Sequence, residues 1–547
     1  MGGWWGGLSR ATASTATRLL CVGVYRDPSF RAAVIEELYV REERFVAPSP
    51  GADMACVLAH ALRARRVEAG FAAVTLLLWG AFGLFTQGLV LLWLVPFLFV
   101  GLSDVAGGRV PEAAPRRVVA AGALTLCGVL AAVLTVPLLT GGALGVWGTG
   151  RDDVPEVQTL LAFLFPFALA EVVDLRWRWL ASVLHRELSA ERFSGVRAGS
   201  VGPRGAATPV RRGTDRFRRV SRRIEEEQHA RLVMYRPENP FCGVGVPNEP
   251  WSLSVELRPR EGQVPEPVDN RTILGHLVPT LERLRTPSRP GGTSGVRDRL
   301  RLLEIEEVVF LPVEGLPHRD VGPGIMGSFD EHRAQAVEEG GEARRYYLRI
   351  SVVGWDGQLV VTVFVRVHTQ GGILVLELVP FTLHPVKAAY RRADREAREW
   401  RRGGPWERTS WVFRRVPGAT FAGPVTLLRQ IVSVLRGAGR GRSLPDGPAV
   451  SVRELGSDAE LPPFPAMDAQ RYLTSIKERV ATEVRQALHE AGWQTGEFER
   501  KVVSVASGGI FIESAHGAVG IGDGNTVTTH MSGAQSAGNA QGEQEDA

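Results

Sequence analysis

Cysteine and lysine are scarce in this sequence, and each scarcity removes a class of interpretation. The four cysteines, Cys21, Cys56, Cys127 and Cys242, are widely separated along 547 residues, so neither a disulfide framework nor a CxxC metal motif is available. All but three of the 64 basic residues are arginines, and 62 residues are glycine, a balance typical of GC-rich coding sequences. We therefore do not interpret the net charge of +5 as a nucleic-acid-binding surface, and we expect no nucleic-acid partner.

The sequence also lacks the short motifs of common enzyme classes. It contains no Walker-type loop, HExxH, GxSxG or protein-kinase set. A GxG occurs within residues 239–247, but glycines between prolines are typical of a turn. Cys242 and His384 are far apart in sequence, and no spacing marks them as a nucleophile and its base. We therefore predict no catalytic, cofactor-binding or metal site.

A long apolar stretch fills much of the first third of the chain. The segment from Ala69 to Leu102 carries no charged residue, and as one helix it would be about 50 Å long, against a bilayer core of about 30 Å. We therefore predict a hairpin of two short spans that turns at Thr86 to Gly88, followed by two further spans. Within a transmembrane region of residues 67–184, the four spans cover 71–85, 89–102, 118–141 and 159–173.

Basic residues predict the orientation of these spans, because cationic loops are poorly translocated. Arginines precede the first span, lie between the second and third, and follow the fourth, whereas the loop between the third and fourth is acidic. Four crossings with both termini in the cytoplasm satisfy this pattern and predict a multi-pass protein of the cell membrane. Trp177 and Trp179 should then lie at the cytoplasmic interface, and Asp174 should pair with Arg178 four residues later.

Composition divides the rest of the chain into segments. Residues 1–66 predict cytoplasmic helices, notably at Phe30–Phe45 and Met54–Gly70. Residues 194–230 predict a basic flexible linker and a juxtamembrane helix, and residues 231–492 a soluble α+β domain. A β-prone tail is predicted at 493–531 and a disordered C-terminus at 532–547. Five arginines near the end of the linker are candidates for anionic-lipid contact, the alternative being that they only set topology: Arg216, Arg218, Arg219, Arg222 and Arg223.

The α+β domain has legible elements of both kinds. Strands are predicted at Tyr346–Gly354, Leu359–Val367 and Ile373–Phe381, joined by short turns into an antiparallel β-meander. Helices are predicted at Pro424–Arg436 and Asp468–Ala491, the second ending before Gly492. Apolar residues lie along one face of each helix: Val425, Leu428, Val432 and Leu435 in the first, and Leu473, Ile476, Val480, Val484 and Leu488 in the second.

Two segments carry a resemblance to a known group of proteins. NPFCGVGVPNEPWSLSVEL at 239–257 and GWDGQLVVTVFVRV at 354–367, together with four N-terminal spans, resemble a group of uncharacterised multi-pass membrane proteins from actinobacteria. The resemblance implies the architecture: four transmembrane helices as two hairpins, followed by a soluble α+β domain. It implies no activity.

The tail carries a second resemblance. Val519, Ile521, Gly522, Asn525 and Val527 are spaced similarly to the RIP homotypic interaction motif and its bacterial amyloid-signalling relatives. The resemblance implies templated self-assembly, although Gly520 stands where that motif has glutamine. The other interpretations are a local hairpin around Asp523-Gly524 and a disordered tail.

These features lead to one function hypothesis and three alternatives. We expect a non-enzymatic membrane anchor whose cytoplasmic α+β domain binds a protein partner. The alternatives are a membrane-associated signalling or defence component that assembles through its tail, a membrane-bound enzyme with dispersed catalytic groups, and a small transporter or pore.

Overall fold

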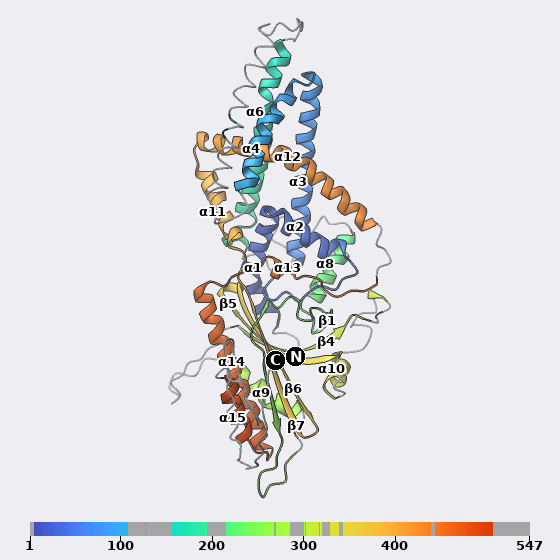
Figure 1. Ribbon diagram of the computed structural model, residues 1–547, viewed down its shortest axis with the longest axis vertical. Coiled ribbons are helices and arrows are strands. Elements are labelled where there is room, and N and C mark those ends of the chain that lie inside the picture. The colour runs from blue at the N-terminus through green and yellow to red at the C-terminus, as the bar shows by residue number, and fades with distance from the viewer. Residues whose placement is uncertain are drawn as a thin grey trace, which may run out of the picture. The chain divides into compact units, whose positions relative to one another are not determined.

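The computed structural model, drawn in Figure 1, divides into two compact units. The first comprises Met1–Pro250, Val278–Arg366 and Leu378–Lys477, and the second comprises Trp251–Leu277, Val367–Glu377 and Glu478–Ala547. The predicted third span, apart from residues 126 and 129, lies outside the described residues, as do the linker at 194–214 and the tail beyond 506. The structure describes residues 5–107, 126, 129, 156–193, 215–266, 268, 270–284, 300, 302–314, 316, 318–319, 329–338, 343–438 and 444–506.

The first unit begins with two helices, α1 (Trp5–Arg26) and α2 (Pro28–Ile35). Asp27 caps α2, because its carboxylate accepts hydrogen bonds from the backbone N–H groups of Ser29 and Phe30. A π-helical turn, η1 (Glu36–Val40), ends this helical stretch. The helix predicted over Phe30–Phe45 is therefore too long. Its last residues leave the helix because the N–H of Phe45 donates instead to the carbonyl of Asp446, at 2.9 Å.

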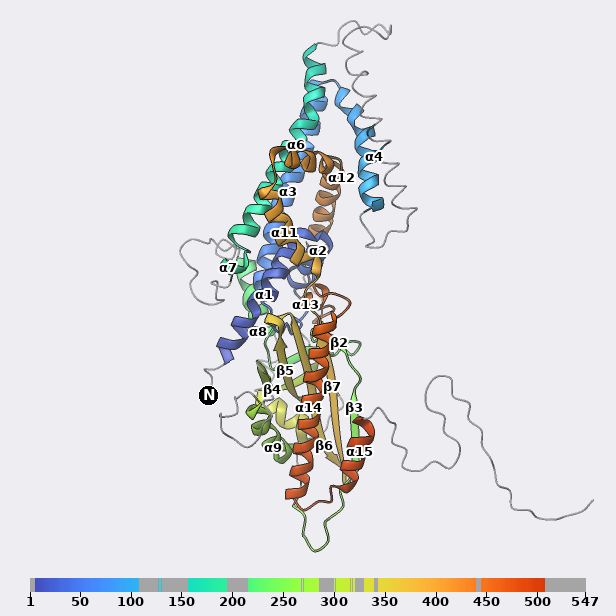
Figure 2. The same cartoon turned by 90° about the vertical axis from the view of Figure 1, so that its left-hand side faces the viewer.

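The predicted cytoplasmic helix and the first predicted span form one continuous helix, α3 (Met54–Phe85). A tight turn follows at the expected position, where Gln87 and Gly88 have φ angles of 49° and 89°. The chain then returns through η2 (Leu89–Trp93) and α4 (Leu94–Gly107), so the turn of the predicted hairpin is confirmed (Figure 2). A second long helix, α6 (Glu156–Arg186), contains the fourth predicted span and precedes the short α7 (Ala190–Phe193).

Two of these helices are long and apolar enough to cross a membrane. They are α3 and the Val157–Arg186 part of α6, and a helix of about 20 residues already spans a bilayer core of about 30 Å. Asp174 and Arg178 form the predicted ion pair on α6. The N-terminal region is thus helical, with two long apolar helices that could span a bilayer.

A curled sheet follows helix α8 (Asp215–Glu227), with strand order β1-β4-β5-β6-β7-β2 and with β3 also pairing with β7. The predicted meander is confirmed as β5 (Arg345–Gly354), β6 (Leu359–Gln370) and β7 (Ile373–Leu383). β4 and β6 are both antiparallel to β5, whereas β1 runs parallel to β4. The remaining strands of this path are β1 (Leu232–Tyr235), β2 (Val246–Pro247) and β4 (Leu303–Pro312), and the turn between β5 and β6 is η5 (Trp355–Gly357).

Helix α12 (Pro405–Ala438) differs from its prediction in extent. It begins well before Pro424 and continues through both Pro417 and Pro424, so the proline that was expected to start the helix lies inside it. On the predicted apolar face of its second half, Val425 is 46% exposed and Leu428 is 63% exposed. In its first half, in contrast, Val412 and Val416 are buried.

The other helices follow their sequence signals more closely. α14 (Pro463–Glu490) begins five residues before the predicted start, and all five residues of its predicted stripe are buried. Gly492, with a φ of 84°, follows its end as expected. The remaining helices are α9 (Asn270–Arg283), α10 (Phe329–Glu338), α11 (Ala388–Arg402) and α13 (Val452–Leu455).

In the second unit, part of the predicted β-prone tail is helical instead. Helix α15 (Gly496–Ala506) contacts β3 (Trp251–Glu256), and the Lys501 ammonium donates to the carbonyl of Ser254 at 3.0 Å. An ion pair of 2.8 Å between Glu497 and Lys501, four residues apart, supports the helix. Burial of Phe498, which is 1% exposed, outweighs the β propensity of the valines that follow it.

The GxG segment forms a turn, as predicted, and the turn binds a carboxylate of the same chain. Gly243 and Gly245 have φ angles of 105° and 106°. Their N–H groups donate to one oxygen of Glu454, at 2.9 and 2.8 Å. This small anion-binding concavity is therefore occupied by a side chain of the protein itself and stabilises the fold.

Replacing Gly243 should destabilise the first unit. A Cβ in Gly243→Ala would overlap the carbonyl oxygen of Pro48, in a backbone conformation that side chains rarely adopt. We expect a loss of about 2–4 kcal/mol, against about 1 kcal/mol for Gly262→Ala, which has a φ of 75° but open space around it. Thermal unfolding of the two full-length variants in detergent compares them. Equal melting temperatures would contradict the packing described here.

Candidate functional site

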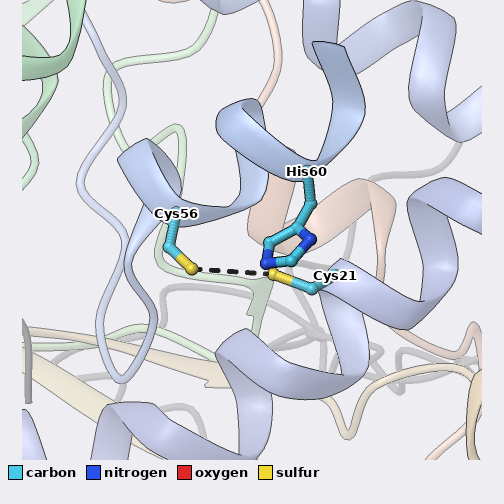
Figure 3. A group of neighbouring side chains, drawn as sticks. All are labelled: Cys21, Cys56 and His60. Atoms are coloured by element: carbon cyan, nitrogen blue, oxygen red, sulfur yellow. Dashed lines mark hydrogen bonds between the residues drawn. The ribbon is translucent and has the colours of Figure 1, made fainter. Parts of the chain in front are cut away.

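Three side chains with metal-binding or redox chemistry meet inside the N-terminal helices. Cys21 comes from α1, whereas Cys56 and His60 lie one turn apart on α3 (Figure 3). The two sulfurs are 3.9 Å apart, and the candidate ligand atoms of all three residues lie within 4.8 Å of one another. Residues 35 positions apart in the sequence thus form one compact cluster, which we call the Cys–Cys–His cluster.

The packing of α1 against α3 creates this cluster. Both helices contribute apolar side chains to one buried core, among them Leu20 and Val24 of α1 and Val57 and Ala61 of α3. On α3, Cys56 and His60 are four residues apart and therefore share a face. That face is turned toward α1, so the cluster depends on the same contacts that hold the two helices together.

The surroundings of the cluster are largely buried. Cys21 is 0% exposed and His60 is 6% exposed. The hydroxyl of Tyr25 and Nδ1 of His60 are hydrogen-bonded at 3.0 Å. The Asp53 carboxylate caps α3 by accepting the N–H groups of Ala55 and Cys56. The imidazole is therefore held in a fixed orientation by the helix that carries Cys21.

The two thiols have opposite pKa shifts. Burial raises the pKa of the Cys21 thiol, and its hydrogen bond with Cys56 raises it further. The hydrogen bond from Cys21, followed by that from His60, lowers the pKa of Cys56 to about 6 despite its burial. Cys56 precedes residue 71, where the first predicted span begins, so it lies outside the predicted membrane segment. Its thiolate is the better metal ligand and the better nucleophile of the two.

Sequence analysis did not anticipate this cluster. The distance between Cys21 and Cys56 along the chain carries no pairing signal, because only the fold brings α1 beside α3. The one local indication is the spacing of Cys56 and His60, which places two ligand types on one helical face. Such spacing is common by chance and does not by itself predict a site. Cys242, in contrast, is buried, and burial raises the pKa of its thiol, which opposes a role as a nucleophile.

The five predicted lipid-contacting arginines divide into two groups on α8. Arg216 donates to Glu42 at 2.6 Å and lies over the ring of Tyr39, while Arg223 lies 3.9 Å from the same carboxylate. Through these contacts, the two arginines hold α8 against the segment around η1. The other three, Arg218, Arg219 and Arg222, are exposed and stay candidates for contact with anionic lipids. The candidate self-assembly residues Val519, Ile521, Gly522, Asn525 and Val527 lie outside the described residues, and their role stays a prediction.

Two arginines of α8 should therefore respond differently to removal. Arg216→Ala should cost about 1–2 kcal/mol of stability, because it removes a hydrogen-bonded ion pair and a cation–π contact together. Arg218→Ala should change stability by less than about 0.5 kcal/mol, since that side chain is 70% exposed and pairs with Asp215 of its own helix. Thermal unfolding in detergent measures both. A larger effect at Arg218 than at Arg216 would refute this division.

Comparison with known proteins bears on the region after the N-terminal helices. No curated protein and no solved structure matches the chain. Residues 250–520 match the family model of the AbeC-like domain, a stretch that runs from β3 through α15 and excludes the Cys–Cys–His cluster.

Proposed function

We propose that this protein is a non-enzymatic membrane anchor that presents its α+β region, including the AbeC-like domain, to a protein partner in the cytoplasm. The proposed topology has four spans, two of them within α3 and α6, with both termini in the cytoplasm. Its support comes from the surfaces of α3, α6 and α12.

The exposed apolar side chains of α3 and α6 carry the proposal. In the most apolar stretch of α3, 11% of the residues are buried, and in that of α6, 39%. Leu84 is 82% exposed and Leu160 is 57% exposed. Burying one such side chain is worth about 1.5–3 kcal/mol, and a contiguous apolar surface of this kind is rare on proteins that face water. A core helix of a soluble protein would be mostly buried, so lipid is the environment that fits these two helices.

Helix α12 adds a second apolar surface from the C-terminal half of the chain. It runs across α3, α4 and α6 (Figures 1 and 2). Its Val412 and Val416 share one buried cluster with Phe165 of α6. Its second half leaves Leu428 63% exposed and Ile431 57% exposed. An amphipathic helix with an uncovered apolar face is typical of a helix that lies in the membrane interface.

The contacts of α12 place it at the arginine-rich ends of the apolar helices. Gln430 donates to the carbonyl of Arg65 at 3.2 Å, and Arg65 precedes the first predicted span. Trp411 packs on Trp177 with ring centroids 4.7 Å apart, and the Arg415 guanidinium lies 3.6 Å from the Trp411 centroid. Tryptophan and arginine gather at membrane–water interfaces, and the neighbouring arginines indicate the cytoplasmic one.

Accessibility of added cysteines tests the proposed topology. We expect an impermeant maleimide to label Asp153→Cys in intact cells, and to label Gly107→Cys and Ser536→Cys only after the membrane is permeabilised. Wild-type protein, with its native cysteines kept, provides the background to subtract. Labelling of Ser536→Cys in intact cells would place the C-terminus outside and end the proposal of a cytoplasmic partner.

A polarity-sensitive fluorophore tests the position of α12. Attached at Leu428→Cys in protein reconstituted into liposomes, it should emit at shorter wavelength and be quenched by lipids with nitroxide-labelled acyl chains. The matched control is Thr474→Cys, an exposed position on α14, where neither effect is expected. Equal quenching at the two positions would show that α12 does not contact the bilayer.

A further inference from the structure

The distance between the two sulfurs of the Cys–Cys–His cluster corresponds to that of a tetrahedral metal site. Two thiolates bound to Zn²⁺ at about 2.3 Å, with a tetrahedral angle between them, lie about 3.8 Å apart. The observed separation of Cys21 and Cys56 is 3.9 Å. A disulfide would require the sulfurs to approach to about 2.05 Å, whereas a metal ion would require almost no movement.

The imidazole of His60 is oriented as in a metal ligand. Its Nδ1 is already engaged with the Tyr25 hydroxyl, which leaves Nε2 for another partner. In metal sites, a hydrogen bond from the second ring nitrogen of a histidine ligand likewise fixes its tautomer and ring plane. Figure 3 shows the imidazole and both sulfurs directed toward a common point between α1 and α3.

Charge also favours a divalent cation here. Two thiolates, a neutral imidazole and Zn²⁺ sum to zero, so the occupied site places no net charge in the buried interior. Sulfur and imidazole ligands select zinc and similar soft cations over Mg²⁺ or Ca²⁺, which prefer oxygen. Among the residues that the structure describes, these three converge and leave one coordination position for water or another small ligand.

We propose that Cys21, Cys56 and His60 bind one Zn²⁺ ion, which ties α1 to the cytoplasmic half of α3. The ion would fix the N-terminal helix to the same helix that enters the membrane. Because an ion that binds only the folded state adds its binding free energy to folding, the bound metal would stabilise this end of the first unit.

Metal analysis of the full-length protein in detergent tests the site. After incubation with Zn²⁺ and removal of unbound metal, we expect about one zinc per chain in the wild type, and less than a fifth of that in Cys56→Ser and in His60→Ala. Cys242→Ser removes a buried thiol outside the cluster and should keep full zinc content. Tyr25→Phe should still bind zinc, with an affinity lowered about 10- to 100-fold.

Cobalt substitution makes the result independent of whether the variants fold. Wild-type protein titrated with Co²⁺ should develop thiolate-to-cobalt charge-transfer absorption that one equivalent of Zn²⁺ abolishes. Wild-type protein that binds neither metal would overturn the proposal. So would a Cys21–Cys56 disulfide found in unreduced peptides from freshly isolated membranes, because the sulfurs would then serve as a redox pair.

Discussion

The uncovered apolar side chains on the second half of α3 are the constraint on which the rest of this structure depends. The first half of the same helix packs against α1, α2 and α8, and its Val57 and Leu58 are fully buried. The second half, beyond Gly70, leaves Leu77 71% exposed and Leu84 82% exposed. Since α3 is one continuous helix, its surface changes from buried to uncovered partway along its length.

Ion pairs are concentrated where that change occurs. Glu68 pairs with Arg31 of α2 and, at 2.9 Å, with Arg176 of α6, and Arg63 pairs with Glu187. An unpaired charge is unfavourable both in lipid and in a dry protein core. Pairing with an opposite charge reduces that cost. The ion pairs of Glu68 and Arg63 also join α3 to α6 and to Glu187 just after it. Helix α12 lies across both helices at this level. A small cavity there is lined by Glu68, Arg176 and Gly423. The Cys–Cys–His cluster lies on the protein-covered half of α3.

Local sequence patterns predicted the elements that depend on interactions between residues close in sequence. The β5–β6–β7 meander follows from β-branched runs and short turns, and the hairpin after α3 follows from an apolar stretch too long for one span. The extent of α12 was missed because Pro417 and Pro424 usually interrupt helices in water. The exposure of its apolar face could not be predicted, because the pattern of Val425 and Leu428 is the same whether a face meets protein or lipid.

The Cys–Cys–His cluster could not be predicted, because its members come from helices whose contact is a property of the fold. The α15 helix was missed because small and β-branched residues after Val502 outweighed the signal of Glu497 and Lys501. The division of the α8 arginines likewise required the position of Glu42, which is far from them in the sequence. Local sequence patterns therefore predicted the two long apolar helices and the α+β region, whereas each candidate site needed contacts between distant segments.

Photolabelling from within the bilayer tests the central claim most directly. Phospholipids with a diazirine at the end of the acyl chain would be activated in membranes that contain the full-length protein, and the labelled peptides mapped by mass spectrometry. The account predicts labels on residues 71–85 of α3, on 159–173 of α6 and on the exposed face of α12, and none on β5 to β7. Labels absent from α3 and α6, or as frequent on the meander as on these helices, would contradict it.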